Sequence, residues 1–401
     1  MLGALSERRR LRIAIVGSRG IPAHYGGFET VTEEISAGLS REGFQVYVTC
    51  ESVWGEKGRK AERYATHGGA RLVYFPVVDS IRNFSEVAIH DTLAMLWAAF
   101  SVDIIYMLAY TSAPVLILPK VLGKKIIVNA DGLEWKRPKY NAFLRFLLRA
   151  FEGMSARIAD YTVVDSETLG AYYAREYGVH AVYIPNGVSA IEPLDPAALR
   201  KYGIKSGDYY LVIARLVPDN NIDLIIAGFT RSSSRKKLVV VGPLDRGRYV
   251  GRLLAERSER VLFLGGIYES HMQRTLRHNC FAYIHGHAMG GTNPSLVEAL
   301  SCGNTVLALD IPFNREVAEE FAIYFQKDPD DLKAKIDLVE RGLTGIRKED
   351  VYRLYERKYT AEAAIRKLVK LVVEIAEKRA RGKEHSVACG IPGQQRDPQI
   401  I

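Results

Sequence analysis

Residues 285–303, HGHAMGGTNPSLVEALSCG, have the residue types and spacing that most directly suggest chemistry. Gly290 and Gly291 follow a short apolar run, and glycine leaves room for a ligand to approach the backbone. Asn293 and Pro294 predict a helix start, because asparagine is a favoured N-cap and proline fits the first helical position. The free N–H groups at this start, with the positive end of the helix dipole behind them, predict an anion site suited to phosphate.

Two charged side chains would complete a sugar-nucleotide site here. Glu298 lies one turn into the predicted helix, and such sites pair a phosphate-binding loop with a carboxylate that accepts hydrogen bonds from ribose hydroxyls. Arg215 follows a predicted strand, Tyr209–Ala214, where its guanidinium would neutralise a diphosphate. A simple strand-to-helix turn and a surface arginine are the alternatives, because a single motif is weak evidence.

The N-terminal part contains a second candidate for contact with phosphate. Arg12–Gly17 predicts a first parallel strand, and the next loop contains Gly26 and Gly27 before an amphipathic helix from Phe28. The glycines lack the G-x-G-x-x-G spacing, which disfavours a nicotinamide or flavin dinucleotide site. A long loop with turn glycines is the alternative, and its ten-residue length argues modestly against that alternative.

A charged and aromatic cluster follows the predicted strand Lys125–Asn129. Its members are Asp131, Glu134, Trp135, Lys136 and Arg137. Ligand-binding residues concentrate in loops at strand ends, so the cluster is a candidate for ligand contact, with a solvated loop as the alternative.

The next segment, Tyr140–Ile158, predicts a helix that is apolar around most of its surface. Four apolar residues are expected on one face: Phe143, Leu147, Phe151 and Met154. From Asp131 to Arg157 the chain has six basic and three acidic residues, a net charge of +3. The 131–157 region therefore suits an anionic membrane surface, although a helix this apolar is more often buried between domains.

Length and composition restrict the class of protein. A chain of 401 residues is long enough for two domains, and 48% hydrophobic with 25% charged residues is typical of a soluble globular protein. The net charge of +9 favours anionic partners. Nucleic acid is not expected among them, because zinc-ligand spacing, a helix-turn-helix and an aromatic-studded basic strand pair are all missing from the sequence.

The sequence predicts a cytoplasmic protein, either free or at the inner face of the membrane. Its N-terminus is charged where a signal peptide needs an apolar core, and its longest uncharged run, Ile104–Pro119, has only 16 residues. That run is better explained by a buried strand followed by a helix. The cysteines have no C-x-x-C spacing, which favours reduced, structural thiols: Cys50, Cys280, Cys302 and Cys389.

Apolar strand-like runs alternate with helical stretches on both sides of a polar, proline-bearing segment near residue 190. The further predicted strands are Gln45–Cys50, Ala70–Phe75, Asp103–Leu108, Tyr161–Asp165, Lys237–Val241, Val261–Leu264, Cys280–His285, Thr305–Leu309 and Ala322–Phe325. This alternation predicts the α/β class, with doubly wound parallel sheets and ligands at the carboxyl ends of their strands. The polar segment predicts a domain boundary.

Four ordered motifs between residues 11 and 375 resemble those of the GT-B glycosyltransferases of retaining family 4, and most closely its rhamnosyltransferase-like subfamily. They are GSRGIPAHYGGFET, NADGLEWKR, ARLVPDNNIDLII and HGHAMGGTNPSLVEAL. The resemblance implies two Rossmann-like domains, an acceptor-side domain at 1–190 and a nucleotide-sugar domain at 191–347. A helical segment at 348–381 would cross back to the N-terminal domain, and a loose tail would follow at 382–401.

The resemblance also implies an activity. The enzyme would move L-rhamnose or another hexose from a nucleoside-diphosphate sugar, with retention, to a lipid-diphosphate-linked or saccharide acceptor in surface polysaccharide biosynthesis, without a cofactor. The implied donor-binding residues are Gly26, Gly27, Arg215, Asn220, Gly291, Thr292, Asn293, Ser295 and Glu298. The acceptor would meet Glu134, Trp135 and Lys136.

Two positions depart from the family pattern. Asn220 replaces the usual lysine, and Gly290 replaces the first glutamate of E-x7-E. Both changes suggest an altered sugar pocket, suited to a deoxy sugar such as rhamnose. Asp131 lies near the place where many relatives have a histidine.

Charge development predicts how such an enzyme would work. Cleavage of the sugar–phosphate bond places negative charge on the diphosphate, which oriented N–H groups and Arg215 would stabilise without a metal. Asp328-Pro-Asp-Asp331 contains the letters of a D-x-D motif but predicts a capped helix start. The catalytic candidates are Arg215, Asp131 and His287, although a lone histidine is more often structural.

Two other functions fit the same architecture. A sugar-nucleotide 2-epimerase would need carboxylate acid/base pairs at the sugar, and Gly290 leaves the pocket short of one. A non-catalytic scaffold would not bind nucleotide sugars.

Overall fold

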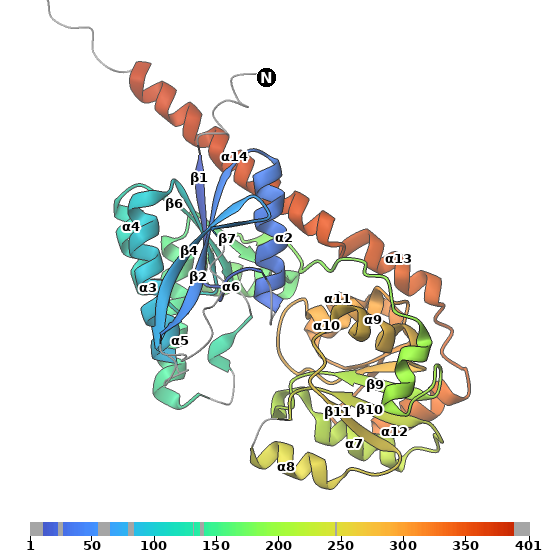
Figure 1. Ribbon diagram of the computed structural model, residues 1–401. Helices are drawn as coiled ribbons and strands as arrows, with labels where there is room; N and C mark the ends of the chain where they lie inside the picture. Colours follow the sequence, from blue (N-terminus) through green and yellow to red (C-terminus); the bar gives the residue numbers. More distant parts are fainter. Residues whose placement is uncertain are drawn as a thin grey trace, which may run out of the picture.

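The computed structural model describes residues 11–22, 27–54, 65–78, 84–130, 132–136, 140–244 and 247–388. The described strands form two sheets, one in each half of the chain (Figure 1). The N-terminal sheet has the order β3-β4-β2-β1-β5-β6-β7-β8. Its strands are β1 (Arg12–Val16), β2 (Gln45–Trp54), β3 (Thr66–His67), β4 (Ala70–Val78), β5 (Ile104–Leu108), β6 (Lys125–Ala130), β7 (Tyr161–Val164) and β8 (Val182–Tyr183).

All neighbouring strands of this sheet are parallel except β3 and β4. Runs such as IIYML in β5 are apolar throughout because helices cover both faces of the sheet. One face packs against α2 (Gly27–Arg41) and α14 (Ala361–Ala388), whereas the other packs against helices from residues 84–177. These are α3 (Phe84–Ser101), the 3-10 turn η1 (Ala113–Leu116), α4 (Ile117–Val121), α5 (Ala142–Ile158) and α6 (Glu167–Tyr177).

The C-terminal sheet is wholly parallel and has the order β11-β10-β9-β12-β13-β14. Its strands are β9 (Tyr209–Ile213), β10 (Lys237–Val241), β11 (Val261–Gly265), β12 (Ala282–His285), β13 (Val306–Leu309) and β14 (Ala322–Phe325). The helices around it are α7 (Ile222–Arg231), α8 (Arg248–Ala255), α9 (Ser270–Asn279), α10 (Pro294–Leu300), α11 (Pro312–Ala318), α12 (Pro329–Glu340) and α13 (Lys348–Lys358). Short 3-10 turns are η2 (Glu134–Lys136), η3 (Pro196–Tyr202), η4 (Pro218–Asn220) and η5 (Glu319–Phe321).

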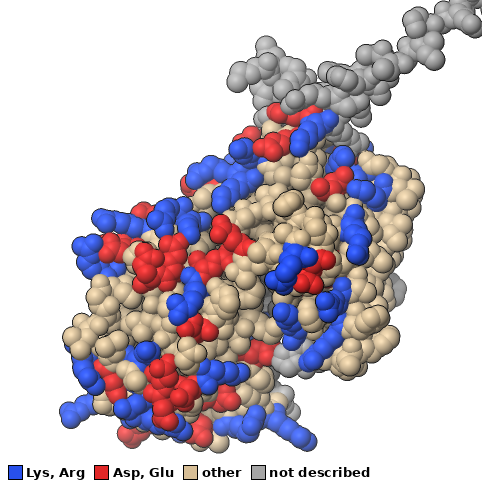
Figure 2. Space-filling view, turned by 180° about the vertical axis from the view of Figure 1, so that it is seen from behind, with Lys and Arg blue, Asp and Glu red and all other residues tan. Residues whose placement is uncertain are grey.

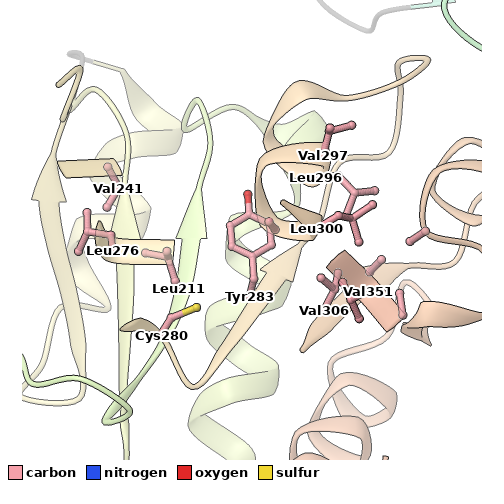
Figure 3. Packing of buried hydrophobic residues seen from close by; sticks show 14 of the residues in the cluster. Leu211, Val241, Leu276, Cys280, Tyr283, Leu296, Val297, Leu300, Val306 and Val351 are labelled. Carbon is pink, nitrogen blue, oxygen red and sulfur yellow. The ribbon is translucent and has the colours of Figure 1, made fainter. Parts of the chain in front are cut away.

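The core beneath β12 fixes α10, the helix on which the predicted phosphate site depends. Leu296, Val297 and Leu300 of α10 pack with Tyr283 of β12 and Val351 of α13 (Figure 3). All five side chains are almost completely buried. The start of α10 is therefore held at the carboxyl end of the sheet.

The final helix returns from the C-terminal half to the N-terminal sheet, which confirms the predicted crossing (Figure 1). Leu368, Leu371 and Ile375 of α14 are buried in the same core as Ile13 of β1. The doubly wound α/β architecture, with helices on both faces of each sheet, is thus confirmed in both halves. The exact domain boundaries at 190/191 and 347/348 remain predictions.

Some predicted elements differ from the structure. The two-residue strands β3 and β8 were not predicted, because so short a run has no measurable periodicity. Helix α14 continues to Ala388, so the predicted loose tail at 382–401 begins inside a helix, and residues 389–401 lie outside the described residues.

The predicted apolar face of α5 is buried only in part. Phe151 and Met154 of that face pack against the core, and the fully buried Leu148 lies one residue beyond the face. Phe143 is 74% exposed, and Phe146 is 73% exposed. The first turns of α5 are therefore not buried between domains, and two aromatic side chains face outward.

Two further features concern the described residues only. No helix among them combines the length and apolar character needed to cross a bilayer. Cys50, Cys280 and Cys302 are free thiols, and burial raises the pKa of each, to about 11 for Cys50. Cys389 lies outside the described residues.

Candidate functional site

The strand orders place the candidate site at a crevice in the C-terminal sheet. From β9 the chain moves outward to β10 and β11 on one side, whereas β12, β13 and β14 follow on the other. The order reverses between β9 and β12, and parallel sheets bind ligands beside such a reversal, at the carboxyl ends of the strands. Arg215 follows β9 and His287 follows β12, so the topology brings these two predicted residues together.

The start of α10 has the predicted capping geometry. Asn293 is the N-cap and Pro294 is the first helical residue. The Asn293 side chain accepts a hydrogen bond from the Ser295 N–H at 3.1 Å. The Ser295 N–H is therefore not free for a donor phosphate, because the cap already occupies it. Among the described residues, no acceptor bonds the N–H of Thr292 or Asn293, and these two groups remain for an anion.

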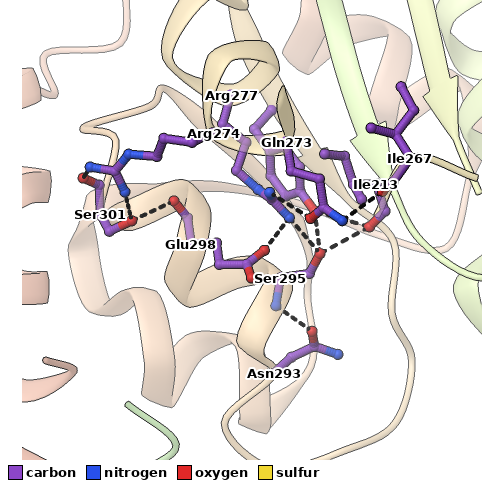
Figure 4. Close-up of polar contacts among 10 residues, drawn as sticks. Ile213, Ile267, Gln273, Arg274, Arg277, Asn293, Ser295, Glu298 and Ser301 are labelled. Carbon is purple, nitrogen blue, oxygen red and sulfur yellow. Dashed lines mark hydrogen bonds and ion pairs between the residues drawn. The ribbon is translucent and has the colours of Figure 1, made fainter. Parts of the chain in front are cut away.

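The side chain of Ser295 is also occupied. Its hydroxyl donates to the Ile213 carbonyl at 3.0 Å and accepts from the Tyr283 hydroxyl at 3.1 Å. These bonds tie α10 to the ends of β9 and β12 (Figure 4). Ser295 thus joins α10 to the two strands. Its predicted direct role in donor binding stays a prediction.

Gly291 and Thr292 face the N-terminal half of the protein. The Thr292 hydroxyl donates to the backbone carbonyl of Asp165, at the end of β7, and Asn186 donates to the Thr292 carbonyl at 2.9 Å. A Cβ on Gly291 would lie 1.7 Å from a carboxylate oxygen of Asp165. The two predicted donor residues therefore form part of the contact between the two halves. The sequence did not predict this contact, because Asp165 and Asn186 lie 127 and 106 residues before Thr292 in the chain.

Glu298 forms an ion pair with Arg277, a residue that the sequence analysis missed (Figure 4). The Arg277 side chain is 2% exposed, and it also bonds the Ser295 hydroxyl at 3.2 Å. The Glu298 side chain is still 34% exposed. Arg277 therefore orients the carboxylate and leaves part of it accessible to a ribose hydroxyl.

Arg215 is exposed and forms no ion pair with any other described residue. Its carbonyl accepts a hydrogen bond from the Asn220 side chain at 2.8 Å. Asn220 is buried, and its bond shapes the loop that carries Arg215. The donor contact of Asn220 stays a prediction, whereas Arg215 is exposed and free to meet an anion.

His285 and His287 stack on each other at the end of β12, with ring centroids 4.3 Å apart. Both rings are neutral near pH 7. Desolvation and the nearby positive charge of Arg215 lower the pKa of His287 to about 3. Desolvation, His287 and Arg277 together hold the pKa of His285 well below its usual value. His287 can thus exchange hydrogen bonds with a ligand as a neutral imidazole.

The predicted acceptor residues lie in η2, after β6. Two cations lie over the Trp135 ring, with the Arg149 guanidinium 5.0 Å and the Lys136 ammonium 5.4 Å from its centroid. Glu134 accepts a hydrogen bond from the Tyr140 hydroxyl at 2.7 Å, and its N–H donates to Tyr110 at 2.8 Å. The cluster is therefore an ordered group of aromatic and charged side chains.

The loop after β6 and the loop after β12 meet. A Cβ on Gly132, in the loop after β6, would lie 3.8 Å from the Cα of Gly290, in the loop after β12. The predicted residues Asp131 and Gly26 lie outside the described residues, and Gly27 is the first residue of α2. Among the described residues, no three His, Cys, Asp or Glu side chains are grouped to hold a metal.

Comparison with known families agrees with this geometry. Residues 196–356 match the family described as Glycosyl transferases group 1, and residues 10–189 match a domain of unknown function (DUF1972). No curated protein matches the chain.

Solved structures with the same fold cover most of the chain. A sucrose-phosphate synthase from Thermosynechococcus elongatus superposes with a TM-score of 0.75 at 16% identity, over 91% of this chain and 99% of that one. Anabaena HepE in complex with UDP-glucose gives a TM-score of 0.69 at 14% identity, over 91% and 100%. The galactosyltransferase WaaB of the lipopolysaccharide outer core gives 0.61 at 16% identity, over 91% and 99%.

The matched domain contains β9, β12 and α10, and therefore Arg215, the stacked histidines and Glu298. The similar structures share both Rossmann-like sheets. The chain thus has the GT-B fold, and its residues 196–356 match the Glycosyl transferases group 1 family.

Proposed function

We propose that this enzyme transfers a hexose from a nucleoside-diphosphate sugar, with retention of configuration, to a lipid-diphosphate-linked or saccharide acceptor in surface polysaccharide biosynthesis. The observation that carries the proposal is the meeting of the two loops at Gly132 and Gly290. A transferase must hold donor and acceptor in contact, and this meeting point lies between the aromatic cluster after β6 and the anion site before α10.

The donor would lie at the crevice between β9 and β12. Arg215 would neutralise the diphosphate, together with the N–H groups of Thr292 and Asn293. Glu298, oriented by Arg277, would accept hydrogen bonds from the ribose. A donor of this class is supported by the similarity to HepE, whose structure contains UDP-glucose.

The transfer step follows from these positions. The bond between the anomeric carbon and the diphosphate oxygen breaks, and the acceptor hydroxyl bonds to the same face of that carbon. The leaving phosphate oxygen takes the acceptor proton, and Arg215 stabilises its developing charge. His287 is neutral, so it would orient the sugar or the acceptor by a hydrogen bond.

The sugar pocket favours a deoxy sugar such as L-rhamnose. Gly290 has a φ of +126°, and no atom lies within 4 Å of the Cβ position. The space that a glutamate would occupy in the family pattern is therefore open. A sugar that lacks one hydroxyl needs one hydrogen-bonding partner fewer, which fits a pocket without this glutamate.

The acceptor would approach from the side of η2 and α5. Trp135 offers an aromatic surface to a saccharide, while the basic 131–157 region suits the diphosphate of a lipid carrier or an anionic membrane. A cytoplasmic enzyme at the inner face of the membrane fits this arrangement. Neither the matched families nor the solved structures named above support the 2-epimerase alternative.

A transfer assay tests the proposal. The purified enzyme is incubated with a panel of nucleotide sugars, dTDP-rhamnose among them, and with polyprenyl-diphosphate saccharides, and the products are analysed by mass spectrometry and NMR. We expect one sugar to be added per nucleoside diphosphate released, with the anomeric configuration of the donor. An isomerised nucleotide sugar without transfer would instead indicate an epimerase.

Arg215→Ala and Arg257→Ala form a matched pair for this assay. Loss of a hydrogen bond to a charged group costs about 1.5–3 kcal/mol, so Arg215→Ala should lower the transfer rate about 10- to 150-fold. Arg257 is exposed and precedes β11, so it lies at the amino end of the sheet, away from the site at the carboxyl end. Its replacement should have no effect. Equal losses in the two variants would contradict the role of Arg215.

A further inference from the structure

Helix α3 has an exposed apolar stripe. Ile89, Leu93, Leu96 and Phe100 recur at intervals of three and four residues and are all exposed, with Phe100 69% exposed. The opposite side of the helix is buried and includes Ala94, Met95 and Ala98. A helix that is apolar all round is ordinarily covered on all sides, so the outward stripe lacks a covering partner within the described part of the chain.

The stripe continues onto the neighbouring helices. Helix α4 contacts α3, and the exposed residues Ile117, Val121 and Leu122 lie on or directly after α4. Helix α5 packs against η1, which precedes α4, and it adds the exposed Phe143 and Phe146. Figure 1 shows α3, α4 and α5 on the side of the N-terminal sheet that lies away from α2 and α14. These exposed residues of α3, α4 and α5 are called the apolar face below.

Positive charges outnumber negative charges beside the apolar face. The stretch 117–125 contains Lys120, Lys124 and Lys125 and no carboxylate. Asp160 pairs with Lys120 at 3.2 Å and with Lys125 at 3.0 Å, which leaves an excess of positive charge. Helix α5 adds basic residues, and its only carboxylate, Glu152, is fully buried.

Figure 2 agrees with this count. The helices at the left of Figure 1 lie at the right of Figure 2, where the surface is largely uncharged and is interrupted mainly by Lys and Arg. An apolar surface with a cationic border is typical of a helix that lies in the interface of an anionic bilayer.

We propose that the apolar face docks the enzyme onto an anionic membrane, with the side chains of α3, α4 and the start of α5 in the headgroup region. A second copy of the chain is less suitable as an occupant. A two-fold contact would place one cationic border against the other, and like charges facing each other oppose association. No described helix can cross the bilayer, so the chain lies on its surface.

The docking places the acceptor region near the lipid. Phe143 and Phe146 follow the acceptor cluster in the chain, and α5 contacts η2, which holds Trp135. A lipid-linked saccharide in the same bilayer could then reach the loop at Gly132. Access to a lipid-linked acceptor rests on the proposed function. The docking itself does not, because the apolar face is exposed whatever the acceptor is.

Vesicle co-sedimentation tests the docking. The full chain is mixed with vesicles of phosphatidylethanolamine and phosphatidylglycerol, and with neutral phosphatidylcholine vesicles as a comparison. We expect binding to the anionic vesicles that weakens as salt rises. The variant L96E/F100E should lower the bound-to-free ratio at least about tenfold, because carboxylates on the apolar face oppose both burial and the anionic surface.

Leu343→Glu is the matched control. Leu343 is 63% exposed on the C-terminal half, and its replacement should leave vesicle binding unchanged. Nucleotide-sugar binding in solution, measured on every variant, shows that L96E/F100E is folded and separates this inference from the proposed function. Vesicle binding without donor binding would overturn the function and leave the docking intact. Three results would each overturn the docking. The first is a wild type that fails to bind anionic vesicles, and the second is L96E/F100E that binds them as well as the wild type does. The third is a wild-type dimer in solution that the substitutions L96E/F100E dissociate.

Discussion

Replacing Gly291 by alanine should separate the two halves of the enzyme at its candidate site. The new Cβ would lie 1.7 Å from the Asp165 carboxylate, whereas ordinary contact begins at 3.4 Å, so the gap must widen by 3.4 − 1.7 = 1.7 Å. Asp165 is buried and accepts a hydrogen bond from Asn186 at 3.1 Å, so its side chain cannot simply rotate away. Overpacking of this kind costs about 1–3 kcal/mol.

The cost falls on the contact between the halves, so catalysis should suffer more than folding. A misplacement of about 1 Å can lower a rate about 100-fold, and we expect a loss of that order in transfer. Gly251→Ala is the matched control, because nothing lies within 4 Å of its Cβ position in α8. The double variant G291A/D165A should recover part of the stability, since it removes the clashing carboxylate.

Thermal unfolding by far-UV circular dichroism and the transfer rate are the two measurements. Tryptophan fluorescence would be a poor choice, because Trp54, Trp97 and Trp135 all lie in the N-terminal half. If Gly291→Ala melts and reacts like the wild type, the halves do not meet at this contact, and the geometry of the site is wrong.

Two further predictions concern buried ionisable side chains. Glu298→Met should destabilise the fold by about 3–5 kcal/mol, because it leaves the buried Arg277 without its ionic partner. Arg277→Met should cost less, because the Glu298 side chain is 34% exposed and can be hydrated. Equal losses of unfolding free energy in urea would contradict the pairing. The two histidines are neutral when folded and have a pKa of about 6.5 when unfolded, so the unfolded chain binds more protons below that pH. The free energy of unfolding should therefore fall as the pH drops from about 6.5 towards about 3. The fall should be shallower in His287→Gln. An unchanged pH slope in that variant would show that His287 is not buried as a neutral ring.

The sequence predicted the features that depend on neighbouring residues. Asn293 caps α10 and Asp328 caps α12, as their positions before proline and an apolar run indicated. The alternation of strands and helices predicted both parallel sheets. Arg215 lies at the carboxyl end of the C-terminal sheet, as its position directly after a predicted strand indicated.

Features that depend on distant residues were not predicted. Arg277 is one of several basic residues in α9, and only the fold shows that it is the one buried against Glu298. The contact of the Thr292 hydroxyl with Asp165 was not predicted either, because it joins positions 127 residues apart. The exposed apolar stripe of α3 was not predicted, since periodicity cannot show that only one side of a helix is covered.

Donor binding is the most direct test of the central claim that Arg215 and the loop before α10 form a nucleotide-sugar site. The measurement is thermal stabilisation of the wild type, Arg215→Ala and Arg257→Ala across a panel of nucleotide sugars, with EDTA present. A ligand at 100 times its Kd adds about 2.7 kcal/mol of stability, which is readily detected. We predict that one donor stabilises the wild type and Arg257→Ala but has little effect on Arg215→Ala. Stabilisation of all three proteins alike, of none, or only when a divalent metal is supplied would contradict the account.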